Sequence, residues 1–113
     1  MMNRFRFVAA AVAGVAVSAS GQNLLVPESG EDVVYVIDGF SGAVINSSFI
    51  DIAAAAASVG YTGTLTPSEA IEVGNEIWVS DQLADRIWTF DRSGIFTGQI
   101  GVDSFGDGQL NNI

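Results

Sequence analysis

After the first twenty residues, short apolar runs alternate along the chain with polar clusters that are rich in Gly, Ser, Asp and Asn. Apolar runs of this length that contain β-branched and aromatic residues, bounded by turn-forming residues, predict β-strands. The stretch from Glu76 to Gly94 shows the pattern best, because two strands, Ile77–Ser80 and Arg86–Asp91, are joined there by a polar turn. Further strands are predicted at 32–38, 43–50, 68–73 and 95–100, and a short apolar run occupies 24–26.

Two segments interrupt the strand pattern. Residues 27–31 begin with Pro and contain Ser and Gly, which predicts a turn. In 51–66, five consecutive alanines, Ala53–Ala57, are followed by Gly60, Gly63 and several threonines. Alanine favours helix, but the run is short and Gly60 ends it, so we predict a connecting loop with about one helical turn.

An internal repeat relates the two halves of the chain. Leu24–Asp38 aligns without a gap on Ile77–Asp91, 53 residues further along, and the chemical class agrees at most positions, as where Tyr35 corresponds to Trp88. Repeats of about this length are typical of solenoids and propellers, and four short strands per repeat favour the propeller. We therefore predict an all-β fold after the leader, with two partial blades at about 22–50 and 67–112 joined by an Ala/Gly/Thr-rich loop at 51–66.

The second unit resembles the NHL-type propeller repeat. That family has a Pro before the first strand, a Gly turn, an apolar strand ending in Asp, an Arg-Ile pair, an aromatic residue followed by Asp, then Gly and a tail similar to Gly-Asp-Gly-Gln. The resemblance implies four-stranded antiparallel blades, and it implies little about function, because propellers host many activities. The matching residues here are Pro67, Gly74-Asn75, Ile77–Asp81, Arg86-Ile87, Phe90-Asp91, Gly94 and Gly106–Gln109.

The number of blades is smaller than a closed ring needs. Propellers close with about four to eight blades, whereas about two fit in this chain and the first of them lacks an innermost strand. Two blades alone would leave strand edges and apolar blade faces open. We therefore expect an incomplete propeller, the N-terminal fragment of a longer protein. The alternative is a small protein that self-associates through its open blade edges.

The first 21 residues have the order of a secretory signal peptide. Arg4 and Arg6 precede the apolar run Val8–Val17, and small residues follow it, so that cleavage is expected after Ala19 or Gly21. The run is shorter than the roughly 20 apolar residues that span a bilayer. The sequence therefore predicts a secreted protein, periplasmic or extracellular, without a membrane span.

The charged residues and the missing residue types restrict the chemistry further. Thirteen acidic residues stand against four arginines, and an acidic surface repels nucleic acid. The chain has no Cys, His or Lys, which excludes thiol nucleophiles, Ser-His-Asp triads, imidazole metal ligands and Schiff bases. We therefore predict no catalytic and no cofactor-binding residues in this portion.

The remaining candidate chemistry is that of carboxylates in turns. Asp81 and Asp85 flank the turn of the second unit, and Glu28 and Asp32 are their counterparts in the first. Paired carboxylates can bind Ca²⁺ through their oxygens, which makes Asp81 and Asp85 weak metal-site candidates. Asp in a turn also caps backbone N–H groups, and the recurrence in both units favours this interpretation. We expect solvent to surround these groups.

Four aromatic residues, Trp78, Trp88, Phe90 and Tyr35, would suit a sugar-binding surface. Strand alternation places Trp88 and Phe90 on one face and Ile87 on the other. Packing between blades explains the pair more simply, because aromatic side chains dominate protein cores.

Three hypotheses for the function follow. The first is a secreted binding or scaffold propeller for an unknown protein or carbohydrate ligand. The second is a portion of a secreted, metal-dependent propeller enzyme of the lactonase or lyase type, whose site lies mostly in other blades. The third is a structural or adhesive protein of the cell surface.

Overall fold

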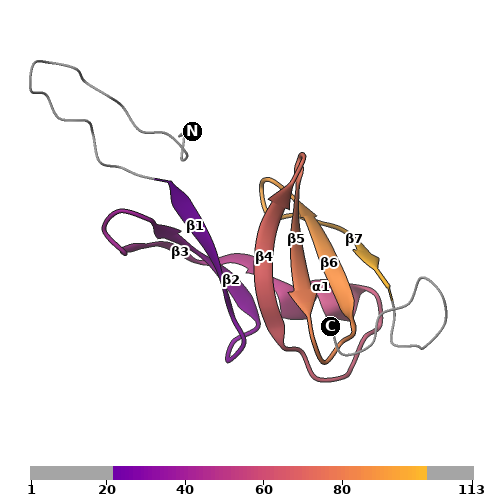
Figure 1. The fold of residues 1–113 in the computed structure, drawn as a ribbon. Coiled ribbons are helices and arrows are strands. Elements are labelled where there is room, and N and C mark those ends of the chain that lie inside the picture. The colour runs from indigo at the N-terminus through magenta and orange to yellow at the C-terminus, as the bar shows by residue number, and fades with distance from the viewer. Residues whose placement is uncertain (1–21, 102–113) are drawn as a thin grey trace, which may run out of the picture.

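The computed structural model describes residues 22–101, so the predicted signal peptide and the Gly/Asp-rich tail at 102–113 lie outside the described residues. The described strands form two antiparallel sheets, each with its strands in sequence order (Figure 1). The predicted all-β class and the four strands of the second unit are confirmed, and the propeller remains a prediction. The first sheet contains β1 (Asn23–Glu28), β2 (Val33–Asp38) and β3 (Val44–Asp51), and the second contains β4 (Pro67–Val73), β5 (Glu76–Asp81), β6 (Arg86–Asp91) and β7 (Phe96–Ile100).

The internal repeat extends to the pairing of individual residues. β1 and β2 have the same lengths as β5 and β6 and begin 53 residues before them. Leu24 lies opposite Ile37 in the first hairpin, as Ile77 lies opposite Phe90 in the second, and the other pairs agree in the same way. β3 and β7 complete the two sheets in equivalent places. β4 pairs with the outer edge of β5, and the first sheet has no equivalent strand among the described residues.

Equivalent aspartates adopt the same unusual backbone conformation in the two hairpin turns. Asp32 has φ 60° and Asp85 has φ 56°, both in the left-handed region. Outside glycine this region is adopted mainly by Asn and Asp. The aspartates at these two positions therefore suit the backbone that the turn requires.

The next turn of each sheet is also built alike. Gly42 and Gly94 have φ 80° and 87°, and the carboxylates of Asp38 and Asp91 accept backbone N–H groups of the turns that they begin. At Gly94 space is a second constraint, because an added Cβ would lie 2.6 Å from the carbonyl oxygen of Phe49. A side chain at this position would push the β6–β7 turn away from β3.

β1 is longer than the sequence predicted. It continues through Pro27 and Glu28, which we had assigned to a turn, and Pro27 lies opposite Val34 in the ladder. Proline lacks an N–H donor and is tolerated in strands at the edge of a sheet. β1 is such an edge strand, and this explains why the proline does not end it.

The prediction of about one helical turn in 51–66 was too short. Helix α1 spans Ile52–Ser58, seven residues or nearly two turns. The Asp51 carboxylate caps its first turn by accepting the N–H of Ala54 at 2.9 Å, an interaction worth about 1 kcal/mol. The helix ends before Gly60, as predicted, and Gly60 has a φ of 80°.

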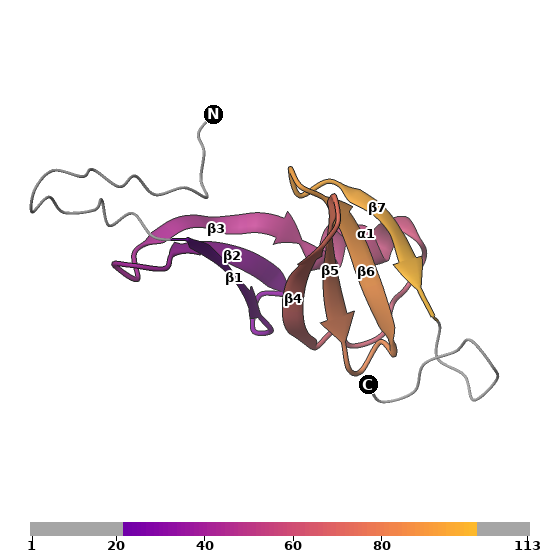
Figure 2. The ribbon, with the colours of Figure 1, turned by 45° about the horizontal axis from the view of Figure 1, so that its top comes forward.

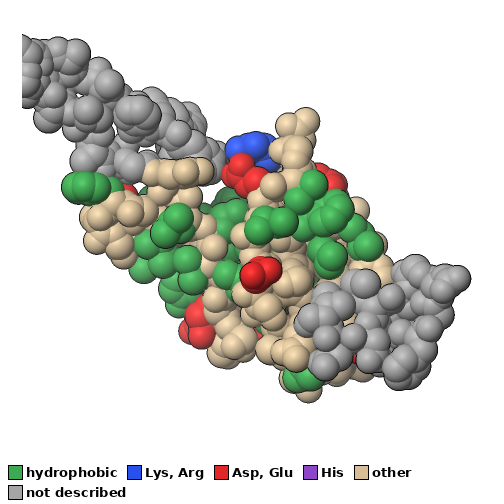
Figure 3. Space-filling model, viewed as in Figure 1, with side chains coloured by type: hydrophobic (Ala, Val, Ile, Leu, Met, Phe, Trp, Pro, Cys, Tyr) green, Lys and Arg blue, Asp and Glu red, His purple; other side chains and the backbone are tan. Residues whose placement is uncertain are grey.

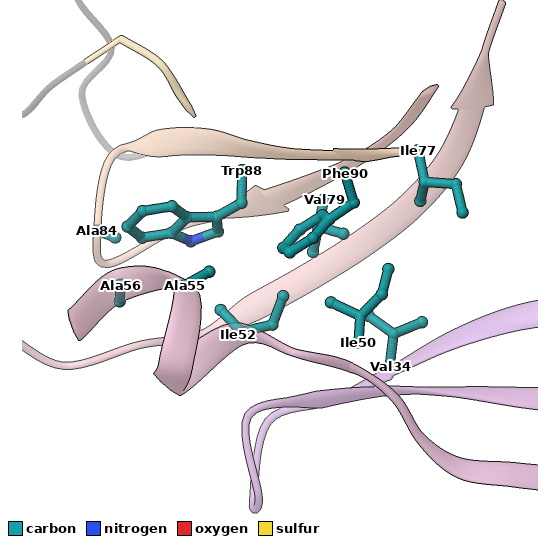
Figure 4. Packing of buried hydrophobic residues seen from close by; sticks show 10 residues of the cluster. All are labelled: Val34, Ile50, Ile52, Ala55, Ala56, Ile77, Val79, Ala84, Trp88 and Phe90. Atoms are coloured by element: carbon teal, nitrogen blue, oxygen red, sulfur yellow. The ribbon is translucent and has the colours of Figure 1, made fainter. Parts of the chain in front are cut away.

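The hydrophobic core lies between the second sheet on one side and the first sheet together with α1 on the other (Figure 4). Figure 2 shows the first sheet extending to one side of the second sheet, next to β4. Four side chains that are at most 2% exposed form the inner face of the second sheet: Ile77, Val79, Trp88 and Phe90. The docking face of the first sheet, Leu25, Val34 and Ile50, packs against this inner face beside Ile52, Ala55 and Ala56 of α1.

Candidate functional site

Asp81 holds together the turn between β5 and β6. Its Oδ1 accepts the backbone N–H groups of Thr66, at 2.8 Å, and of Ala84, at 3.1 Å, and its Oδ2 accepts the indole N–H of Trp88 at 3.0 Å. The predicted role as a turn cap is confirmed by the bond from Ala84. The expectation that solvent surrounds this carboxylate was wrong, because Asp81 is fully buried. Thr66, which belongs to the long connecting segment, helps to cover it.

Glu28 has the corresponding role in the first sheet. Its Oε1 accepts the N–H of Glu31 at 2.7 Å, which is the bond that Ala84 makes to Asp81, and its Oε2 accepts the N–H of Gly30 at 3.1 Å. Glu28 is only half-buried. The repeat therefore preserves the cap of the turn, while only the second copy encloses it.

Asp32 combines a structural contact with an unfavourable electrostatic environment. Its backbone carbonyl accepts the N–H of Ile52 at 2.9 Å, at the start of α1. Its Oδ1 is buried, and no donor for it exists among the described residues. Burial raises the pKa of this carboxyl group, and the negative charges of Asp81, Glu28 and Asp51 raise it further. The acid therefore resists ionisation more than an exposed aspartate does.

These carboxylates do not make a metal centre. In 22–101, no three Asp, Glu, His or Cys side chains gather into a group that could hold a metal ion. Both oxygens of Asp81 already face N–H donors, so a Ca²⁺ ion would have to displace these hydrogen bonds. Asp85, the second candidate, is buried in the same turn at the left-handed position. The two residues thus fit a turn better than a calcium site.

Trp88 and Phe90 belong to the core, which confirms the packing interpretation. The Trp88 ring meets the ring of Tyr61 edge-on at 6.1 Å and lies 6.2 Å from that of Phe96. The guanidinium of Arg86 lies 4.5 Å from the centre of the Tyr61 ring, a distance that suits a cation–π contact. The sequence analysis missed Tyr61, since it lies in a segment that we predicted as a loop.

The opposite side of the second sheet carries an apolar surface. We define the open face by the four apolar side chains that alternation places away from the core: Ile71, Trp78, Ile87 and Ile100. Ile71 lies opposite Trp78 and Ile87 lies opposite Ile100 in neighbouring strands. Ile71 and Ile100 are exposed, and Trp78 and Ile87 are half-buried. Hydrophobic side chains are visible over this sheet in Figure 3, which looks at the side away from α1.

Hydrogen bonds orient the polar groups beside the open face. The carboxylate of Glu76 accepts the indole N–H of Trp78 at 3.1 Å and the hydroxyl of Thr97 at 3.2 Å. The hydroxyls of Thr97 and Thr89 are 2.9 Å apart. Because Glu76 binds the polar edge of the indole, the ring of Trp78 remains available for apolar contacts. The alternation of residues in β5 and β6 could have indicated this face, but we considered Trp78 only as a general aromatic candidate.

Comparison with protein-family models, with curated proteins and with solved structures found no match for this chain. The similarity to the NHL-type repeat therefore rests on its sequence motifs alone. Within the described residues, none of the helical structure is long and apolar enough to cross a bilayer.

Proposed function

We propose that the chain is a secreted binding or scaffold protein, built from β-propeller-like blades, that presents sheet surfaces to a partner. The observation that carries this proposal is the open face of the second sheet, where the ring of Trp78 and the exposed side chain of Ile71 lie on a rigid β-scaffold. Exposed apolar patches on stable elements are typical of interaction surfaces. The leader-like pattern of the first 21 residues supports export.

The known carboxylate contacts also favour binding over catalysis. General acid–base catalysis needs a group that can reach a substrate and exchange a proton with it. Asp81 is buried and already accepts three hydrogen bonds, two from the backbone and one from Trp88. Its contacts suit the stabilisation of the turn, which leaves the sheet surfaces as the best candidates for the function.

Occupation of the open face can be measured through tryptophan fluorescence. The chain has two tryptophans, and only Trp78 is partly exposed, so a ligand on the open face should shift its emission. We would titrate soluble oligosaccharides and candidate extracellular proteins into the full chain and use Trp78→Phe as the control, in which the shift should disappear. A ligand that binds equally well to wild type and Trp78→Phe, without a shift in either, would contradict the assignment of the open face.

A screen for turnover separates this proposal from the enzyme alternative. We expect the full chain to hydrolyse lactones, esters and glycosides no faster than buffer does, with or without Ca²⁺. Turnover that is clearly above buffer and disappears in Asp81→Asn or Asp85→Asn would instead make these acids part of an active site.

Export has its own test. N-terminal sequencing of the product from the producing cell should show a chain that begins at Ser20 or Gln22, after cleavage behind Ala19 or Gly21. A mature protein that still begins at Met1 would refute the predicted signal peptide.

A further inference from the structure

The contact between the two sheets is a pattern that the chain can repeat. In this contact, Leu25, Val34 and Ile50 of the docking face pack against the inner face of the second sheet. The two faces are different surfaces of equivalent sheets, because the inner face of one sheet meets the opposite side of the other. Such a contact is heterologous, since it leaves one unused face of each kind at its two ends.

The open face is the second copy of the docking face. At the 53-residue offset, Trp78 is the equivalent of Leu25, and Ile87 is the equivalent of Val34. Ile100 lies opposite Ile87 in the second sheet as Ile50 lies opposite Val34 in the first. All three positions of the docking face thus have apolar equivalents on the open face.

The first sheet carries the second copy of the inner face. We define its outer face by the equivalents of Ile77, Val79, Trp88 and Phe90, which are Leu24, Val26, Tyr35 and Ile37. The alignment pairs apolar with apolar and aromatic with aromatic at all but the last position, where Ile37 replaces Phe90. In the second sheet these positions are at most 2% exposed, whereas Leu24 is 49% exposed and the other three are half-buried.

We propose that copies of this chain associate head to tail, with the open face of one copy docked on the outer face of the next. The internal contact between the sheets supplies the geometry, and each copy carries both complementary faces. This inference names a partner for the binding protein proposed above and rests on that proposal in using the open face as the binding surface. A chain that remains monomeric would overturn the association, while other ligands of the open face would still be detected by the emission of Trp78.

The net charge opposes this association and makes it dependent on salt. The formal charge of the chain is −9 at pH 7, so two copies repel each other. Because dissolved salt screens charges beyond roughly 8 Å at 0.15 M, association should strengthen as salt is added. The experiment is therefore performed at about this salt concentration and repeated at a tenth of it.

Single surface substitutions on each face test the proposal. Ile71→Glu places a carboxylate on the open face, and Leu24→Glu places one on the outer face. Leu83→Glu, in the β5–β6 turn, is the matched control, since it adds the same charge to a side chain of similar exposure, 54% against 55% and 49%. All three positions are exposed, so the fold should persist, and circular dichroism of each variant checks this.

Sedimentation velocity over a range of concentrations gives the decisive measurement. The mean mass of the wild-type full chain should rise with concentration, and Leu83→Glu should behave alike. Ile71→Glu and Leu24→Glu should each lower the association constant by more than about tenfold, since each buries a carboxylate against apolar groups. A wild-type chain that stays monomeric, or a control that is as disruptive as the other variants, would overturn the proposal.

Mixing the two variants distinguishes head-to-tail from symmetric association. Ile71→Glu keeps an intact outer face, and Leu24→Glu keeps an intact open face, so one unimpaired contact remains when they are combined. The mixture should form dimers that contain one copy of each variant and grow no further. A mixture that is no heavier than its separate components would show that the contact is not the heterologous one.

Discussion

Equivalent positions in the two sheets have the same strand pairing and very different surroundings. Trp88 and Phe90 are fully buried in the second sheet, whereas Tyr35 and Ile37 are half-buried in the first. The difference lies in what covers them, because the docking face of the first sheet and α1 pack only on the second sheet. Local sequence thus determines the hairpin and its register, and burial is determined by the neighbouring element.

The same contrast holds for the charged groups of the turns. Asp81 is enclosed and accepts hydrogen bonds from three residues, whereas its equivalent Glu28 is half-buried and accepts bonds only within its own turn. Three predictions test how far the burial of the second sheet, rather than the repeated hairpin itself, accounts for stability.

The largest effect is expected at the aromatic position. Trp88→Ala should lower the free energy of unfolding by about 3–5 kcal/mol, because it leaves a cavity in the core. Tyr35→Ala removes a half-buried ring at the equivalent position and should cost less than about 1.5 kcal/mol. Urea denaturation of the full chain, followed by circular dichroism, measures both. Similar losses in the two variants would show that burial does not separate the two sheets.

A smaller difference is expected for the turn carboxylates. Asp81→Ala leaves the N–H groups of Thr66 and Ala84 and the indole of Trp88 without their acceptor, which should cost about 2–3 kcal/mol. Glu28→Ala removes bonds to groups that water can replace, so its cost should stay under about 1 kcal/mol. The same denaturation experiment decides between them. A loss for Glu28→Ala as large as that for Asp81→Ala would contradict the proposed difference.

The smallest effect, and one of opposite sign, is expected at Asp32. Burial and the charges of Asp81, Glu28 and Asp51 raise its pKa in the folded protein. Its contribution to stability is therefore complete below the ordinary value of 3.8 and is lost as the pH rises through the folded value. Asp32→Asn removes the charge and suits the left-handed backbone, so it should stabilise the protein at pH 7 by less than about 1 kcal/mol.

The pH dependence of the Asp32→Asn effect is its own control. The gain over wild type should disappear near pH 3, where Asp32 is protonated in both the folded and the unfolded protein. Paired urea denaturations at pH 7 and near pH 3 give the two differences. A variant that is less stable than wild type at pH 7 would show that the charge of Asp32 contributes a favourable contact.

The sequence predicted the strands well because their signal is local. Alternating apolar residues and turn-forming Gly and Asp determine a hairpin over about a dozen residues, and the 53-residue alignment transferred the register of one hairpin to the other. The choice of the buried face was not available in β2, because Val33–Ile37 is apolar on both sides. Only the position of the second sheet shows that Val34 is the core residue.

The errors in the candidate site came from contacts with a distant segment. Asp81 was correctly predicted to cap its turn, but its burial depends on Thr66, and the Trp88 cluster depends on Tyr61. Both residues lie in the segment that we treated as a loop. A signal for its helix was present in Asp51, a good N-cap residue two positions before the alanines, and the short length of the run concealed it.

The strand order has a consequence for folding during synthesis. Every hydrogen-bonded strand pair of the described fold joins strands that are adjacent in the sequence, so each sheet can form from a local stretch of chain within microseconds to milliseconds. Chains are synthesised at about 5–20 residues per second, and the first sheet is therefore complete seconds before β5 and β6 leave the ribosome. During this interval Val34 and Ile50 have no inner face to pack against, which makes the docking face the surface that most needs protection by chaperones.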